Sequence, residues 1–238
     1  MNRDAIILNP AVRLAARIVR TLARLLDPYG KTSYAQEGED LLLGRIFATQ
    51  EDGFYVDVGA HHPLRFSNTY LLYRQGWHGI NIDAMPGSMK NFRRLRPRDI
   101  NIESAVALED TCLTYHVFRE RALNTFDEAL ARQYVESGLP RVSTLEVRVR
   151  PLADLLSEHL PVSQRIDLLT IDVEGLDLDV LKSNDWTRFR PRVLIVEELR
   201  QSPGAAGTSI REYLAGLRYG EFARIYNSAF YLDMQERF

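Results

Sequence analysis

Five short apolar runs, separated by segments long enough to form helices, constrain the fold of this chain more than any other feature. They occupy residues 54–58, 79–83, 100–106, 166–172 and 193–197. Short buried strands that alternate with helices are typical of a parallel sheet covered on both faces. Near the end of the chain, residues 222–226 and 230–233 flank Asn227-Ser228 and predict an antiparallel hairpin. We therefore expect an α/β fold with a mostly parallel sheet and a C-terminal antiparallel hairpin.

A long segment, residues 108–165, interrupts this alternation. Its pattern predicts a strand at 115–118, a helix at 126–136, a strand at 145–149 and a helix at 152–159. Insertions of this kind can cover the ligand crevice of an α/β sheet. We expect an acceptor lid here, within one domain that spans residues 32–238.

Composition excludes several classes of protein. Of the 238 residues, 45% are hydrophobic and 26% are charged, as in ordinary globular domains. The single cysteine, Cys112, excludes an internal disulfide and a cysteine-rich zinc site, and fits a reducing cytoplasm. A net charge of −2 argues against general nucleic-acid binding. No run approaches the roughly 18 apolar residues of a membrane span, so we expect a cytoplasmic protein.

The N-terminal segment, residues 1–31, has six basic and two acidic residues, a net charge of +4. Arg13, Arg17, Arg20 and Arg24 share one stripe of a predicted amphipathic helix. Two interpretations stay open. The helix packs on the domain with its arginines in water, or it makes a peripheral contact with anionic lipid on the inner face of the membrane.

Acidic residues gather where the predicted strands end. Asp57 with Gly59, then Asp83, Asp172 and Glu197, each close one strand. Ligands of such sheets bind outside the carboxyl ends of the strands. Because clustered carboxylates are unfavourable unless they serve a ligand or a metal, this edge of the sheet is the predicted site.

The loop after the first strand restricts the ligand. Residues 57–63 contain one glycine, Gly59, whereas a dinucleotide fingerprint needs three, and the chain has no Walker-type element. S-adenosylmethionine, which carries no phosphate, fits better than NAD. Asp83 is suited to accept both ribose hydroxyls, and Asp57 to hold the amino group directly or through water.

Three motifs resemble those of one methyltransferase family. They are Ser33-Tyr34-Ala35-Gln36-Glu37-Gly38-Glu39-Asp40, Val56-Asp57-Val58-Gly59-Ala60-His61 and Ile171-Asp172-Val173-Glu174-Gly175. In order and spacing they resemble the FkbM family from about residue 33 to residue 198. The resemblance implies a seven-stranded Rossmann-like class I methyltransferase that uses S-adenosylmethionine, commonly on hydroxyls of sugars or glycan-derived products. His61 stands where the family often has Asn, and Asp83 where Glu is common.

The resemblance also extends the expected cofactor site. It implies that Ser104 and Ala105 lie near the adenine ring and that Gln36 and Glu39 close over the methionine end. The expected cofactor-binding set is Gln36, Glu39, Asp57, Gly59, His61, Asp83, Ala84, Met85, Ser104 and Ala105. Alternatives stay open: Asp83 as a helix N-cap, Gln36 and Glu39 as a solvated first turn, and Ser104 as a turn residue.

Methyl transfer to a hydroxyl needs a base or a metal ion, because a neutral hydroxyl is a poor nucleophile. Asp172, Glu174 and His62 are the candidate catalytic residues; His62 could instead cap its own turn. Asp172 with Glu197 or Glu198 would offer hard oxygen ligands to Mg²⁺, or Asp172 simply accepts hydrogen bonds. The side chains suited to sugar hydroxyls, or to ordinary turns, are Arg65, Asn68, Thr69, Asn124 and Thr125.

The sequence therefore predicts an O-methyltransferase for a small sugar or glycan-type acceptor, with no nucleic-acid partner. The alternative is a non-catalytic module on the same fold that binds an adenosine ligand. The acids at the strand ends favour the enzyme.

Overall fold

The structure, a computed structural model, describes residue 19, residues 29–198 and residues 209–235. Residues 1–32 and residues 33–238 form separate compact units. The predicted basic helix within residues 1–31 lies almost wholly outside the described residues, so both interpretations of it stay predictions. Within the described part of the chain, no helix combines the length and the apolar character that a bilayer span requires.

A seven-stranded sheet organises the larger unit, in the order β3-β2-β1-β7-β8-β10-β9. The first five strands of that order are parallel, β10 runs antiparallel to β8, and β9 pairs antiparallel with β10. The strands are β1 (Phe54–Val58), β2 (His78–Asp83), β3 (Ile100–Glu103), β7 (Leu168–Ile171), β8 (Val193–Glu197), β9 (Tyr219–Ile225) and β10 (Ser228–Asp233). The expected fold class is confirmed, with the hairpin loop at Tyr226-Asn227 and Ser228 already in β10.

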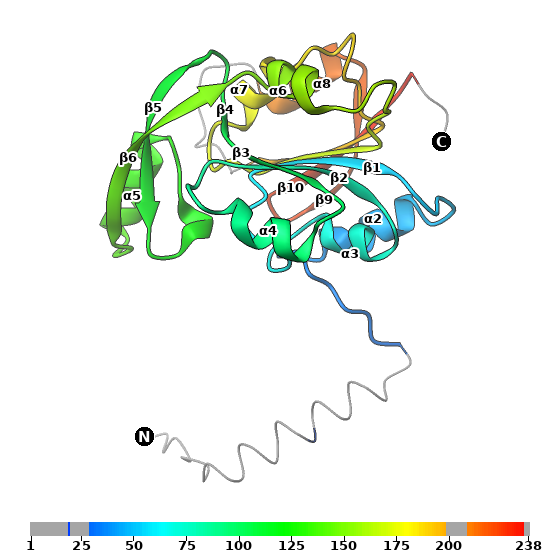
Figure 1. The fold of residues 1–238 in the computed structure, drawn as a ribbon, viewed down its shortest axis with the longest axis horizontal. Coiled ribbons are helices and arrows are strands. Elements are labelled where there is room, and N and C mark those ends of the chain that lie inside the picture. Colours follow the sequence, from blue (N-terminus) through cyan, green and yellow to red (C-terminus); the bar gives the residue numbers. More distant parts are fainter. Residues whose placement is uncertain (1–18, 20–28, 199–208, 236–238) are drawn as a thin grey trace. The chain divides into compact units, whose positions relative to one another are not determined.

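Helices cover both faces of this sheet, which is why its strands are apolar on both sides (Figure 1). On one face lie α2 (Glu39–Ile46), α3 (Tyr70–Arg74) and α4 (Met89–Leu95). On the other lie α6 (Leu152–His159), α7 (Asp177–Lys182) and α8 (Ile210–Gly216). Side chains alternate along each strand: Val56 joins the core under α6 and α7, whereas Tyr55 joins the core under α2 and α3.

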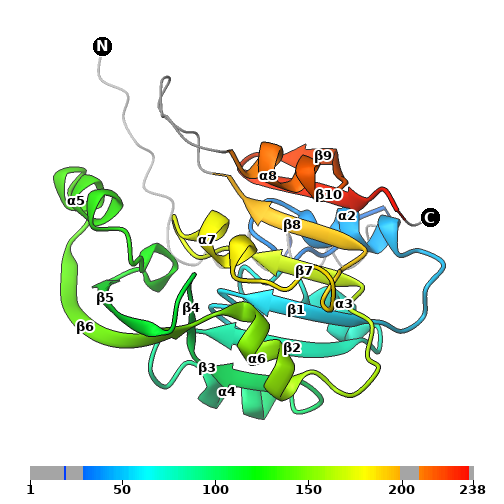
Figure 2. The ribbon, with the colours of Figure 1, turned by 90° about the horizontal axis from the view of Figure 1, so that it is seen from above.

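The segment between β3 and β7 forms a second, three-stranded sheet in the order β4-β6-β5. Its strands are β4 (Ala105–Val106), β5 (Thr111–Phe118) and β6 (Arg141–Arg150), with the 3₁₀ helix η1 (Arg121–Leu123) and α5 (Glu128–Glu136) between β5 and β6. The strand predicted at 100–106 is thus split at Ser104, because β4 leaves β3 and pairs with β6. Figure 2 shows the small sheet beyond the carboxyl ends of β1, β2 and β7.

The predicted insertion, residues 108–165, includes one helix that belongs to the main fold. Leu152, Leu155 and Leu156 of α6 are buried in the core of the large sheet. The part that leaves this sheet therefore ends near Arg150, where β6 returns.

Candidate functional site

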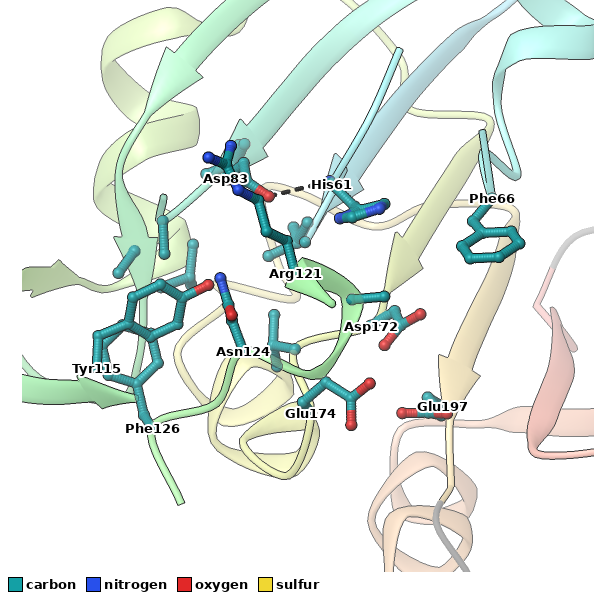
Figure 3. A pocket seen from close by; sticks show the side chains of 18 of the residues that line it. His61, Phe66, Asp83, Tyr115, Arg121, Asn124, Phe126, Asp172, Glu174 and Glu197 are labelled. Carbon is teal, nitrogen blue, oxygen red and sulfur yellow. Dashed lines mark hydrogen bonds between the residues drawn. The ribbon is translucent and has the colours of Figure 1, made fainter. Parts of the chain in front are cut away.

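A cavity lies along the carboxyl ends of the parallel strands, between the large sheet and the insertion (Figure 3). It encloses about 820 Å³, including space open to solvent. Its walls come from Gln36, Val58, Gly59, His61, Phe66, Ile82, Asp83, Ala84, Ser104, Ala105, Val106, Tyr115, Arg121, Ala122, Asn124, Phe126, Asp172, Val173, Glu174 and Glu197. The strand ends that the sequence singled out thus meet around one space.

Gly59 lets two strand ends approach each other at the floor of this cavity. Its φ is +83°, and a Cβ atom built on it would lie 1.8 Å from the carbonyl oxygen of Asp172. The loop is tied to β2 because the amides of Gly59 and Ala60 both donate to the carbonyl of Ile82, at 2.9 and 3.0 Å. Only glycine fits this position.

Asp83, at the end of β2, is 8% exposed and faces the cavity. Its Oδ2 accepts the backbone N–H of His61 at 3.0 Å, and its Oδ1 accepts that of Met85 at 2.9 Å. Each carboxylate oxygen keeps a second lone pair for a ligand hydroxyl. Burial raises the pKa of Asp83, which these two N–H donors lower in part. The contact with Met85 closes a turn and is not a helix N-cap, because α4 begins only at Met89 with Ser88 as its N-cap residue, so the N-cap alternative for Asp83 is wrong.

The end of the cavity beyond Asp83 is partly apolar. Ser104 and Ala105 lie there, joined by Tyr115 and Phe126 of the insertion, whose ring centroids are 4.5 Å apart. Figure 3 shows these two rings beside Asn124, with Arg121 reaching the same end of the cavity. This end suits a flat, mostly uncharged ring.

Three carboxyl groups meet at the opposite end of the cavity. Oxygen atoms of Asp172, Glu174 and Glu197 all lie within 4.8 Å of one another (Figure 3). Burial raises the pKa of Glu174 to about 8 and that of Glu197 to about 7, and the mutual repulsion of the carboxylates adds to both. Asp172 is exposed as a residue, but protein atoms surround its carboxyl group. This desolvation, followed by the charge of the neighbouring Glu197, raises the pKa of Asp172 well above the usual range.

The insertion holds Glu174 in this cluster. Tyr134 of α5 donates to its Oε2 at 2.8 Å, and the hydroxyl of Thr125 donates to its backbone carbonyl at 2.5 Å. Glu174 has a φ of +52°, a conformation that a non-glycine residue adopts at a cost. Asp177 supports the same loop by accepting the N–H groups of Val173 and Gly175, both at 3.2 Å.

Five expected site residues do not line this cavity. The carboxylate of Asp57 accepts a hydrogen bond from Thr69 at 2.6 Å and belongs to a buried polar network around Arg96, away from the cavity wall. Nδ1 of His62 accepts the N–H groups of Leu64 and Arg65, at 3.1 and 3.0 Å, which is the turn-capping alternative.

Glu198, the third expected magnesium ligand, also points away. Its carboxylate accepts hydrogen bonds from Tyr231 and from Arg224, the latter at 2.7 Å. Glu174 takes its place next to Asp172 and Glu197.

The remaining expected residues, apart from Met85, divide between two spaces. Gln36, Gly59, His61, Ala84, Ser104 and Ala105 line the cavity with Asp83. Glu39 lines an adjoining hollow, where its Oε1 accepts the hydroxyl of Ser228 at 2.9 Å. Met85 is not among the lining residues and contributes its backbone N–H to Asp83.

Sequence reasoning missed several lining residues, chiefly Tyr115, Arg121 and Phe126, and also Tyr134, which is not part of the cavity wall but donates to Glu174. All four come from the insertion, whose path over the strand ends depends on long-range pairing of β5 with β6. Their only signal was membership of a segment expected to approach the crevice. Of the five side chains suited to sugar hydroxyls, Asn124 lines the cavity and Asn68 the adjoining hollow. Thr125 lines neither and donates to the backbone carbonyl of Glu174. Arg65 pairs with Glu120 at 3.1 Å, and Thr69 bonds Asp57.

Fold and site together define a Rossmann-like α/β protein with a ligand cavity at its strand ends and a carboxyl cluster at one end of that cavity. Residues 57–221 match the model of the methyltransferase FkbM domain, well over half of the chain. The chain belongs to the FkbM methyltransferase family, and that family implies S-adenosylmethionine as methyl donor. A search of curated proteins found no match.

Proposed function

We propose that this methyltransferase transfers a methyl group from S-adenosylmethionine to a hydroxyl of a sugar or glycan-type acceptor. One observation carries the proposal: a single cavity has a buried carboxylate, Asp83, towards one end and a cluster of three carboxyl groups at the other. The loop between them has one glycine, so it offers no phosphate cradle.

The residues present fit this donor. Asp83 has free acceptor lone pairs for ribose hydroxyls, Ser104 and Ala105 with Tyr115 and Phe126 form a slot for adenine, and the acidic end suits a cationic group. When bound, S-adenosylmethionine supplies an electrophilic methyl group on a positively charged sulfur.

The chain's own part in the reaction is to take the proton of the acceptor hydroxyl. Asp172 or Glu197 is the base we propose, with Glu174 held nearby by Tyr134. A carboxylate whose pKa lies near neutrality is an effective general base at neutral pH. Because the base must be ionised, we expect turnover to rise between pH 6 and pH 8, through the pKa of about 7 of Glu197.

Magnesium stays a second proposal for the same cluster, with Glu174 in place of Glu198. The three carboxyl groups supply the hard oxygen donors that Mg²⁺ prefers. Turnover that survives EDTA unchanged would remove the metal from the account.

A thermal-shift comparison of S-adenosylmethionine, S-adenosylhomocysteine and NAD tests the donor. We expect both adenosyl compounds to raise the melting temperature and NAD to leave it unchanged. Stabilisation by NAD alone would contradict the proposal. Release of S-adenosylhomocysteine in the presence of sugars then separates the enzyme from the alternative, a binding module without turnover.

A further inference from the structure

A hollow adjoins the carboxyl cluster on the side away from Asp83. It shares Gln36, Phe66, Asp172 and Glu197 with the main cavity, and its other described walls are Glu37, Glu39, Asn68, Tyr226, Asn227 and Ser228. These residues come from the segment before α2, from the loop after β1 and from the β9–β10 hairpin. The proposed base therefore faces both spaces.

Two aromatic side chains at this hollow stand in backbone conformations that favour glycine. Phe66 is 37% exposed with a φ of +57°, and Tyr226 is 78% exposed with a φ of +52°. Tyr226 occupies the two-residue loop of a hairpin, where glycine or asparagine would be unstrained. Strain of this kind clusters at functional sites. Four of the six described non-glycine residues with positive φ line the cavity or the hollow: His61, Phe66, Glu174 and Tyr226.

Hydrogen bonds hold the hairpin loop against the rest of the hollow. Ser228 donates to Glu39 at the start of α2, and the N–H of Glu198 donates to the carbonyl of Asn227 at 2.9 Å. Asn68 is fixed in turn by its hydrogen bond to Thr170, at 3.0 Å. The position of Tyr226 is thus set by contacts at its neighbours.

The polar lining of the hollow is acidic and amide-bearing. Four of its residues carry carboxyl groups, three carry side-chain amides, and no described lining residue is Lys, Arg or His. Arg65 stacks on the ring of Phe66, 3.9 Å from its centroid, but is already paired with Glu120. An anionic ligand would therefore meet repulsion from the carboxylates of the lining. Hydroxyl groups, in contrast, can donate to the carboxylates and exchange hydrogen bonds with the amides.

We propose that this hollow binds the methyl acceptor, that the acceptor is an uncharged polyhydroxylated ring, and that Phe66 and Tyr226 determine its specificity. The inference rests on the proposed function and deepens it. The aromatic rings offer an apolar surface to the C–H face of a sugar, while Gln36, Asn68 and Asn227 meet its hydroxyl groups. The reacting hydroxyl then points to Asp172 and Glu197.

This assignment replaces the insertion as the acceptor site. The insertion residues that line the main cavity, such as Tyr115 and Phe126, lie at the Asp83 end, whereas Phe66 and Glu197 lie at the other end (Figure 3). The insertion would then enclose the donor and position Glu174 through Tyr134.

Saturation-transfer NMR on the full chain, with and without S-adenosylhomocysteine, tests the hollow. The probes are the methyl glycosides of glucose, galactose, mannose and rhamnose, and methyl glucosiduronate as the anionic counterpart. We expect saturation transfer from the protein to the ring protons of at least one neutral glycoside. The saturation-transfer signal of the uronate should be at least five-fold weaker.

Two variants locate the binding. Tyr226→Gly should weaken the transfer at least five-fold without lowering the melting temperature, because glycine relieves the positive φ. The matched control is Phe222→Ala, which removes another exposed aromatic ring of the same hairpin outside the hollow and should leave the transfer unchanged.

The inference is overturned if no neutral glycoside binds the wild-type protein, if the uronate binds equally well, or if Tyr226→Gly binds as the wild type does. Calorimetry with S-adenosylhomocysteine on the same samples distinguishes a failure of the acceptor hollow from a failure of the proposed function. Uptake of that compound without glycoside binding leaves the methyl donor in place and removes the acceptor hollow. Glycoside binding without its uptake supports the hollow and contradicts the proposed function.

Discussion

At the scale of single residues, Gly59 and the carboxyl cluster determine what the cavity can hold. Gly59 was recognisable from the sequence because it directly follows an apolar strand that ends near an acid. The partners of the cluster were harder to assign, because Glu197 and Glu198 are adjacent and strand geometry sends them to opposite faces. Glu197 faces the cavity, whereas Glu198 pairs with Arg224.

Replacing Gly59 by alanine should be far more damaging than the same change at Gly87. Both residues have positive φ, +83° and +81°, but a Cβ at Gly87 meets no atom within 4 Å, whereas at Gly59 it overlaps the backbone of Asp172. We expect Gly87→Ala to lower the free energy of unfolding by about 1 kcal/mol and Gly59→Ala by more than about 3 kcal/mol. Urea denaturation of the two variants measures this. Equal losses of unfolding free energy in the two variants would contradict the close approach of Gly59 to the backbone of Asp172.

The half-buried carboxyl group of Glu174 should make the protein less stable as the pH rises. The pKa of Glu174 is about 8 in the folded protein, above its ordinary value of 4.5. Between these two values the folded state retains a proton that the unfolded state has lost, so the free energy of unfolding falls with rising pH. The expected slope is on the order of 1 kcal/mol per pH unit.

Glu174→Gln should remove part of this slope. The variant should match the wild type at pH 5 and exceed its stability by about 1–3 kcal/mol at pH 8, because glutamine carries no charge to bury. Glu136→Gln, at an exposed position of α5, is the control and should leave the slope intact. Parallel slopes for the wild type and Glu174→Gln would contradict the raised pKa.

At the scale of elements, a buried ion pair joins β1, α3 and the turn before β3. Arg96 and Asp99 are wholly buried as side chains, with Nε and Oδ2 2.7 Å apart, and Arg96 also donates to Tyr55 and Thr69, at 2.6 and 3.0 Å. Thr69 in turn donates to Asp57. The sequence placed Asp57 at a strand end but carried no signal for this network, because its members are far apart along the chain.

Asp99→Ala should destabilise the protein by about 3–5 kcal/mol, because it removes the carboxylate that is hydrogen-bonded to the buried Arg96 guanidinium and leaves only Asp57 nearby. The control is Asp110→Ala, which breaks the exposed pair with Arg148, whose atoms are 2.7 Å apart, and should change stability little. Thermal and urea denaturation of both variants provide the comparison. A small loss for Asp99→Ala would mean that Arg96 finds water or another partner.

At the scale of the whole molecule, local patterns predicted the large sheet well and the small sheet poorly. Each strand of the large sheet has its own apolar run and a turn signal, so its limits follow from residues next to one another. The small sheet depends on β6, which is ten residues long and largely exposed, and the alternating pattern marked only its second half, residues 145–149. It also depends on the split at Ser104, whose N–H donates to the carbonyl of Asp83 at 3.1 Å. Only the tertiary contacts decide where the insertion lies, and with it which residues line the proposed adenine slot.

Calorimetric titration of the purified full chain with S-adenosylhomocysteine tests the central claim most directly. The account predicts uptake of one equivalent, and binding at least ten-fold weaker in Asp83→Ala, because that variant loses the carboxylate proposed for the ribose hydroxyls. Asp110→Ala, far from the cavity, should bind as the wild type does. A folded wild-type protein that gives no binding heat at several temperatures and no thermal shift, or an Asp83→Ala variant with unchanged affinity, would contradict the account.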